Sequence, residues 1–108
     1  MALEVVEMQP FSVHMPRTSQ GPDRDLLRRV FGLTIVELRR AQGMAQETVA
    51  LESGIDRGYM GGLERGRHVP TLDTIYKLLP VFGISFTQFA EAFEVGLRRA
   101  QRQAKRNH

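Results

Sequence analysis

The chain has 108 residues, of which 42% are hydrophobic and 25% are charged, and it contains neither cysteine nor tryptophan. This length suits one compact domain and is too short for two. The lack of cysteine excludes a disulfide framework, a Cys-ligated metal site and a thiol nucleophile. Because aromatic residues make up only 7% and helix formers abound, the composition favours an all-α fold.

The formal net charge of +3 is unevenly distributed along the chain. Residues 1–22 carry one basic and two acidic residues (net −1), residues 23–97 carry nine and ten (net −1), and residues 98–108 carry five and none (net +5). The basic excess is therefore confined to the C-terminal end. A nucleic-acid-binding surface on the central part must be argued from the positions of individual arginines.

Residues 1–22 contain three prolines and a glycine among polar residues, without a sustained helical period, and this predicts a flexible N-terminal arm. A short strand over Leu3–Met8 that pairs across a dimer is the alternative. The segment lacks the basic and apolar regions of a secretion signal, and no apolar run approaches the roughly 18 residues of a membrane span. We therefore expect a cytoplasmic protein that is not bound to a membrane.

From residue 23 onward, apolar residues recur at the spacing of a helix. The first predicted helix runs from Asp23 to a C-terminal glycine at Gly43. The second spans residues 46–52, and Ser53-Gly54 closes it with a tight turn. The third begins after Asp56, a good N-terminal capping residue, and ends at Gly66.

Two further helices follow. Thr71 can cap the fourth, which is expected to end or kink near Pro80 because proline cannot donate a backbone hydrogen bond. Ser85–Gln88 has the S-x-x-Q form of a capping box and opens the fifth helix. Its apolar stripe reaches Ala104 with a weak point at Gly96, so an extended C-terminal helix is expected.

The second and third helices, joined by a glycine-containing turn, have the geometry that lets one helix brace across a phosphate backbone while the next enters the major groove. Residues 31–89 resemble the Cro/C1-type (XRE) helix-turn-helix family of bacterial and phage regulators. The matching residues are Phe31-Gly32, Ile35, Arg39, Gly43, Gln46, Ala50, Gly54-Ile55, Tyr59-Met60, Leu63-Glu64-Arg65-Gly66, Pro70, Leu72 and Phe82-Gly83-Ile84.

The resemblance implies a five-helix, lambda-repressor-like bundle that binds a palindromic double-stranded DNA operator as a homodimer. It divides the chain into the arm at 1–22, a helix-turn-helix DNA-binding domain at 23–97 and a basic tail at 98–108. Arg39 and Glu64 resemble the family's partly buried ion pair, against the alternative of unpaired surface charges. Ala50 is expected to be small because two helices cross closely there, and Gly54 to adopt a positive φ.

The resemblance also assigns roles at the DNA interface. Gln46 resembles the family glutamine that hydrogen-bonds a DNA phosphate, the alternative being an ordinary exposed polar residue. Ala45 replaces the usual Ser or Thr cap before it. Arg57 holds the first position that commonly reaches base edges, where it contacts either a guanine or a phosphate. Tyr59 is expected either to pack on the DNA backbone or a thymine methyl, or to belong to the core.

Three glycines, Gly58, Gly61 and Gly62, stand where other family members present polar side chains to DNA. Either the helix backbone approaches the groove closely at these glycines, or specificity depends on DNA shape. Each glycine costs about 1 kcal/mol in a helix relative to alanine, which suggests a close-packing need.

Arg65 and Arg67, with His68 beside them, are placed to meet phosphates unless their loop is merely solvated. The basic residues of the tail suit a helix C-terminus, so capping and solubility are the simpler explanation for them. They are Arg98, Arg99, Arg102, Lys105 and Arg106.

The three histidines share no metal-ligand spacing, and no phosphate-loop or nucleophile motif occurs. We therefore expect no enzymatic activity, no metal and no cofactor. The sequence favours a DNA-binding transcriptional regulator, a repressor or autoregulator, with restriction–modification controllers as a narrower possibility. An antitoxin or adaptor that acts by protein binding, through the arm or the fifth helix, is the alternative.

Overall fold

The computed structural model describes residues 23–106, and these form an all-α bundle, as predicted. Its five helices are α1 (Arg24–Ala41), α2 (Gln46–Ser53), α3 (Arg57–Glu64), α4 (Leu72–Phe82) and α5 (Phe86–Arg106). The expected arm at residues 1–22, including the possible strand at its start, lies outside the described residues. No helix end falls at residue 98, because α5 continues from the domain into the basic segment.

Most predicted helix starts carry the expected capping hydrogen bonds. The Asp56 carboxylate accepts from the Tyr59 backbone N–H at 3.0 Å, and the Thr71 hydroxyl accepts from Thr74 at 3.1 Å. Ser85 and Gln88 form both hydrogen bonds of the capping box, at 2.9 and 3.1 Å. These side chains satisfy backbone donors that the first turn of a helix leaves unpaired, so the sequence fixes where the helices begin.

The end of α4 differs slightly from the expectation. The helix includes Pro80 and continues to Phe82 before Gly83 ends it in a left-handed conformation. Proline removes only one helical donor, and the last turn ends soon after it. The glycine thus sets the final residue of this helix, and the proline does not.

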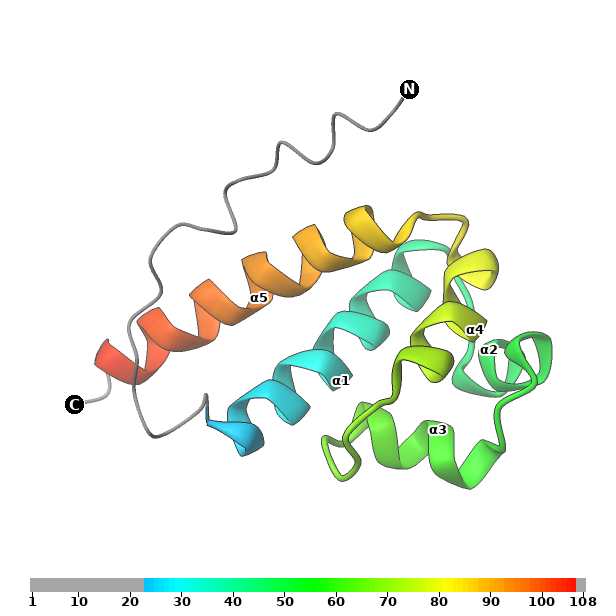
Figure 1. Ribbon diagram of the computed structural model, residues 1–108, viewed down its shortest axis with the longest axis horizontal. Helices are drawn as coiled ribbons and strands as arrows, with labels where there is room; N and C mark the ends of the chain where they lie inside the picture. The colour runs from blue at the N-terminus through cyan, green and yellow to red at the C-terminus, as the bar shows by residue number, and fades with distance from the viewer. Residues whose placement is uncertain (1–22, 107–108) are drawn as a thin grey trace, which may run out of the picture.

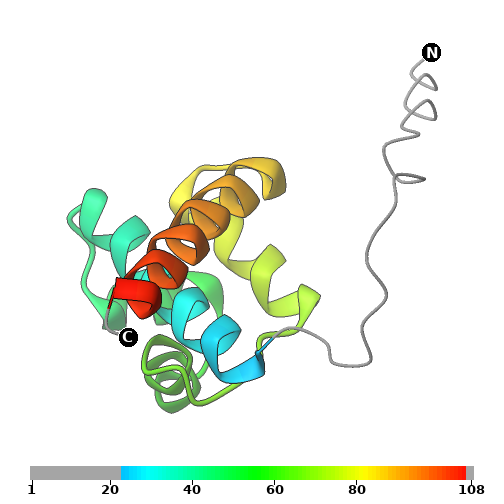
Figure 2. The same cartoon turned by 90° about the vertical axis from the view of Figure 1, so that its left-hand side faces the viewer.

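The long helix α5 lies antiparallel along α1, and α3 packs on the opposite side of α1 (Figure 1). The view turned by 90° shows the same order of α5, α1 and α3 (Figure 2). Helices α2 and α4 pack on each other and complete the core around Ile35, Met60, Leu63, Leu78 and Phe82, whose side chains are at most 1% exposed. Helix α3 therefore buries one face and leaves the other at the edge of the bundle.

The crossing of α1 and α3 depends on a glycine. A Cβ atom at Gly32 would lie 2.5 Å from the backbone carbonyl oxygen of Glu64 and 2.6 Å from that of Leu63. Both distances are shorter than van der Waals contact, and backbone atoms cannot turn away as a side chain can. Only glycine at this position lets the C-terminal end of α3 rest on α1.

We predict that Gly32→Ala lowers the free energy of unfolding by about 2–3 kcal/mol, because overpacking outweighs the gain in helix propensity. Gly96→Ala is the matched control, since its Cβ would meet a Val30 methyl at 3.2 Å, a side-chain atom that can shift. Denaturant unfolding of both variants measures the difference. Equal stability of the two variants would contradict the close-crossing argument.

Candidate nucleic-acid interface

Helices α2 and α3 are held at a fixed angle by the turn between them. Gly54 ends α2 with a φ of 75°, a left-handed conformation in which glycine is not strained. Ile55 is 8% exposed, and its N–H donates to the Ala50 carbonyl at 3.0 Å. Asp56 then starts α3. The end of α2, a buried side chain and the start of α3 thus fall within three consecutive residues, Gly54 to Asp56, and this makes the turn rigid.

Helix α3 divides into a buried and an exposed face. Met60 and Leu63 are fully buried, whereas Arg57, Gly58 and Arg65 are exposed. Two arginines thus stand near opposite ends of the exposed face. The first of them, Arg57, holds the position that the family resemblance predicts to reach a base edge or a phosphate.

A buried carboxylate joins three helices behind this face. Glu64 accepts from Arg39 Nε at 2.7 Å and from Arg39 Nη2 at 3.0 Å, so the pair is bidentate. Arg39 also donates to the Met44 carbonyl at 3.1 Å. The two side chains are 14% and 5% exposed. The hydrogen bond to Glu64 raises the pKa of Arg39 and outweighs the opposite effect of burial, so the guanidinium stays charged.

Gln46 at the start of α2 belongs to the same network. Its Nε2 donates to Glu64 Oε1 at 2.8 Å. The N-terminus of α2 has no side-chain cap, as the alanine at position 45 predicted. One amide hydrogen of Gln46 is therefore committed to Glu64, and the second, together with backbone N–H groups of the first turn, remains available to a hydrogen-bond acceptor outside the chain.

Arg57 has a partner that the sequence did not predict. Its Nη1 lies 3.0 Å from Glu47 Oε2 of α2, and both side chains are more than 60% exposed. The two residues lie ten positions apart on different helices, so no local spacing rule could have found the pair. Exposed ion pairs contribute about 0–1 kcal/mol, so Arg57 can leave Glu47 at little cost.

The structure buries two of the three glycines of α3 and leaves the third exposed. Gly61 and Gly62 are buried by side chains of this chain. A Cβ at Gly61 would lie 3.1 Å from Arg65 Nη1, and one at Gly62 would lie 2.5 Å from His68 Cδ2. The close packing that these glycines permit is therefore intramolecular. Gly58 alone of the three is exposed, with only Asp56 Oδ2 within 3.4 Å of its Cβ position.

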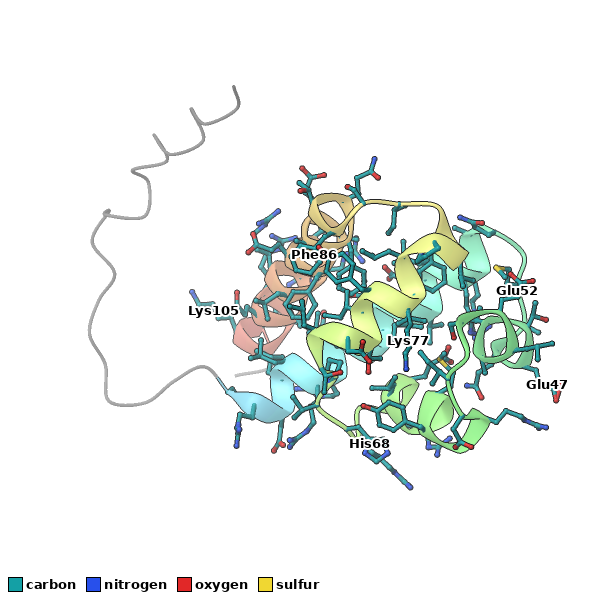
Figure 3. The ribbon with its side chains drawn as sticks, turned by 45° about the vertical axis from the view of Figure 1, so that its right-hand side comes forward. Glu47, Glu52, His68, Lys77, Phe86 and Lys105 are labelled. Atoms are coloured by element: carbon teal, nitrogen blue, oxygen red, sulfur yellow. The ribbon has the colours of Figure 1, made fainter. Side chains whose placement is uncertain are left out.

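The loop after α3 continues the interface. Tyr59 is partly buried and stacks on His68, with ring centroids 4.9 Å apart and planes inclined by 25°. Figure 3 shows α2 with Glu47 to one side of α3 and His68 to the other. Arg67 is exposed in the same loop. The exposed members of the predicted DNA-contacting set thus lie on α3, at its C-terminal end and in the loop after it: Arg57, Gly58, Arg65 and Arg67.

The basic residues of the C-terminal segment lie apart from this surface, on the last turns of α5. Arg98 lies 3.9 Å from Glu94, and Arg99 lies 3.4 Å from Glu37 of α1. Within residues 23–106, no helix is long and apolar enough to span a membrane, and no group of three acidic or histidine side chains is placed to hold a metal ion.

A bundle with two short helices joined by a rigid turn, the second exposing an arginine-bearing face, defines a helix-turn-helix DNA-binding protein. The family model described as helix-turn-helix matches residues 35–89. The chain belongs to this family, the Cro/C1 type, and is a DNA-binding transcriptional regulator.

Named relatives agree with this assignment. The uncharacterised HTH-type transcriptional regulator y4dJ of Sinorhizobium fredii is 39% identical over 62 residues, which are 57% of this chain and 80% of that protein. The restriction–modification controller protein C.AhdI of Aeromonas hydrophila is 42% identical with a TM-score of 0.56, over 62% of this chain and 98% of that one. The restriction–modification controller protein C.Esp1396I is 29% identical with a TM-score of 0.60, over 67% of this chain and 91% of that one.

We predict that Glu64→Gln lowers the free energy of unfolding by about 3–5 kcal/mol, because it leaves the charge of Arg39 without its partner. Asp73→Asn is the control, since Asp73 pairs with Lys77 at 3.5 Å on an exposed surface and its loss should cost less than about 1 kcal/mol. Denaturant unfolding of both variants tests this. If Glu64→Gln were as mild as Asp73→Asn, the pair would not join the helices as argued.

Proposed function

We propose that this regulator binds a palindromic DNA operator as a homodimer and represses transcription, including that of its own gene, by occupying a promoter. The observation that carries the proposal is the exposed N-terminal end of α3, where Arg57 stands beside the uncapped N-terminus of α2. One helix thus presents a base-reading side chain while its neighbour presents donors to a phosphate.

The proposed roles follow from position. Arg57 reads a guanine through two hydrogen bonds in the major groove, and exposed Gly58 lets the helix approach the bases closely. Gln46 holds a phosphate. Arg65 and Arg67 contact the backbone beyond α3, and Tyr59 packs at the edge of the interface.

The solved relatives support this reading. C.Esp1396I has been solved as a tetramer in complex with its natural 35 base-pair operator. Solved variants of that protein include changes at an arginine and at a tyrosine two positions later, which is the spacing of Arg57 and Tyr59 here. Because these relatives are regulators, they support a role for this chain without catalytic activity. They also support a location in the cytoplasm, where bacterial DNA lies.

An exposed apolar surface that suits contact with a second subunit lies on the side of α4 and α5. Four of the seven exposed large hydrophobic residues within residues 23–106 gather there, and we call them the α4–α5 apolar surface: Val69, Leu72, Tyr76 and Phe86. Tyr76 and Phe86 stack with centroids 5.4 Å apart and planes inclined by 7°. Exposed apolar patches of this kind mark protein interfaces.

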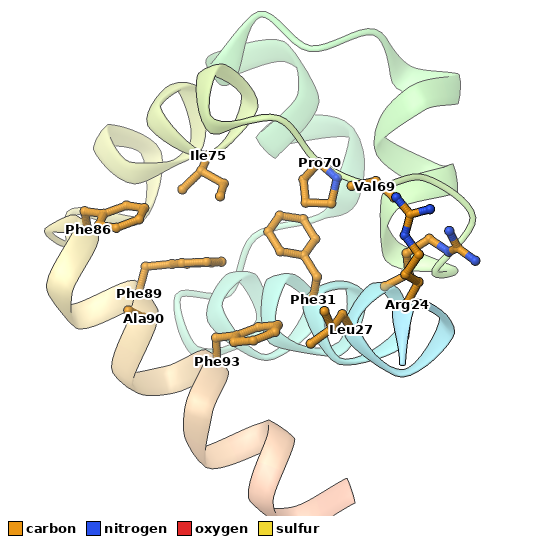
Figure 4. A pocket seen from close by; sticks show the side chains of 11 residues that line it. Arg24, Leu27, Phe31, Val69, Pro70, Ile75, Phe86, Phe89, Ala90 and Phe93 are labelled. Atoms are coloured by element: carbon orange, nitrogen blue, oxygen red, sulfur yellow. The ribbon is translucent and has the colours of Figure 1, made fainter. Parts of the chain in front are cut away.

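This surface borders an apolar groove of about 340 Å³. Phe31, Phe89 and Phe93 line it together with Ile75, and Val69 and Phe86 of the apolar surface also contribute (Figure 4). The groove would supply a recess for apolar side chains of the partner, as the buried centre of an interface does. We propose that the two subunits meet here.

We predict that Tyr76→Glu converts the dimer to a monomer without unfolding it, because Tyr76 is 53% exposed in the single chain. Affinity for a palindromic operator should then fall, while affinity for an isolated half-site changes little. Leu33→Glu, at another exposed apolar residue on α1, is the control. Light scattering after size exclusion measures the mass, and a dimer in both variants would refute this interface.

The operator itself is found by selecting bound fragments from random DNA at a stated salt concentration. Recovery of a palindrome supports the proposal. A chain that selects no sequence and instead binds a co-expressed protein would favour the antitoxin or adaptor function.

We predict that Arg57→Ala weakens binding to the selected operator by about 1–3 kcal/mol and relaxes the preference at one position of each half-site. Arg67→Ala is the control: it should weaken binding to all sequences alike and reduce the salt dependence by about one phosphate contact. Titrations on operator and base-substituted DNA give both quantities. Unchanged affinity and preference in Arg57→Ala would show that the base-reading residue lies elsewhere.

A further inference from the structure

Position 62, in the second turn of α3, is a glycine. The helix therefore has no side chain of its own to offer a base at this position. The space is nevertheless filled. A Cβ atom at Gly62 would lie 2.5 Å from Cδ2 of the His68 ring and 3.6 Å from its Cε1. The imidazole therefore occupies the place where a side chain at residue 62 would begin.

Two contacts besides the glycine hold the ring there. Tyr59, one turn earlier on α3, stacks on it at 4.9 Å. The loop that carries it is tied to the same helix, because the Arg67 N–H donates to the Gly62 carbonyl at 2.8 Å. His68 nevertheless remains exposed. The ring is thus positioned by α3 and open to a ligand that approaches α3.

The neighbouring glycine shows the same arrangement. At Gly61, the Arg65 guanidinium lies 3.1 Å from the Cβ position. Both glycines disfavour a helix relative to alanine, and each gives room to a polar side chain from further along the chain. The face of α3 is therefore built from residues that follow its second turn as well as from those within it.

We propose that His68 reads a base edge of the operator in the major groove, in place of a side chain at position 62. This proposal rests on the proposed function and names a specificity-determining residue for it. A neutral imidazole has one donor and one acceptor nitrogen. It can donate to N7 or O6 of guanine, or accept from the amino group of adenine or cytosine.

The test compares wild type, His68→Ala, Gly62→Ala and the double variant on the selected operator and on unrelated DNA of equal length, at one salt concentration. His68→Ala should weaken binding to the operator about tenfold and binding to unrelated DNA less than twofold. Gly62→Ala should weaken operator binding as much, because the new methyl group displaces the ring. In the double variant Gly62→Ala should add no further loss.

Gly58→Ala is the matched control, since its Cβ position lies near Asp56 Oδ2 and not near His68. Any effect that it has should add to that of His68→Ala. Thermal unfolding should show that Gly62→Ala is at least as stable as wild type. If Gly62→Ala is less stable, His68→Ala and His68→Gln still test the proposal, because neither adds an atom to α3. His68→Gln restores a hydrogen-bond donor and should recover part of the operator affinity that His68→Ala loses.

Three results overturn the proposal. The first is that His68→Ala binds the operator as tightly as wild type, and the second is that it loses equal affinity for operator and for unrelated DNA. The third is that the double variant loses operator affinity by the product of the two single effects. The second result would make His68 a phosphate contact only. The third would mean that the methyl group introduced by Gly62→Ala acts on DNA directly and not through His68. Failure of the proposed function is distinguishable, because wild type would then select no operator at all.

Discussion

The geometry of the DNA-binding surface depends on the hydrogen bonds that the Glu64 carboxylate accepts. It receives hydrogen bonds from Arg39 at the end of α1 and from Gln46 at the start of α2, and it sits itself in the last turn of α3. Three helix ends therefore meet at one charge. Such a pair adds little net stability, but removing either partner is costly, so its main effect is to permit one arrangement of the helices.

That arrangement also requires close approach of the backbones. Gly32 lets α3 rest on α1, and the turn anchored by the buried side chain of Ile55 sets α3 against α2. The recognition helix is only eight residues long and contains three glycines, so it would be unstable alone. Its stability comes from packing, which leaves the composition of its exposed face free for function.

The exposed face of α3 carries few long side chains of its own, and residues of neighbouring elements lie beside it. Gln46 comes from α2, and His68 from the loop after α3, while Glu47 of α2 pairs with Arg57. The domain at residues 23–97 is nearly neutral as a whole, with nine basic and ten acidic residues. Recognition by a few positioned groups and by dimer spacing therefore fits the molecule better than attraction by bulk charge.

The sequence by itself determined the helices, their capping residues, the glycine of the turn and the family, because these follow from local periodicity, backbone preference and a recognisable spacing of residues. It also singled out Arg39 and Glu64, although only through the resemblance. The partner of Arg57 and the burial of Gly62 beneath His68 were decided by tertiary structure alone. These contacts depend on how a loop folds back over a helix and how two helices cross, and no spacing along the chain encodes either.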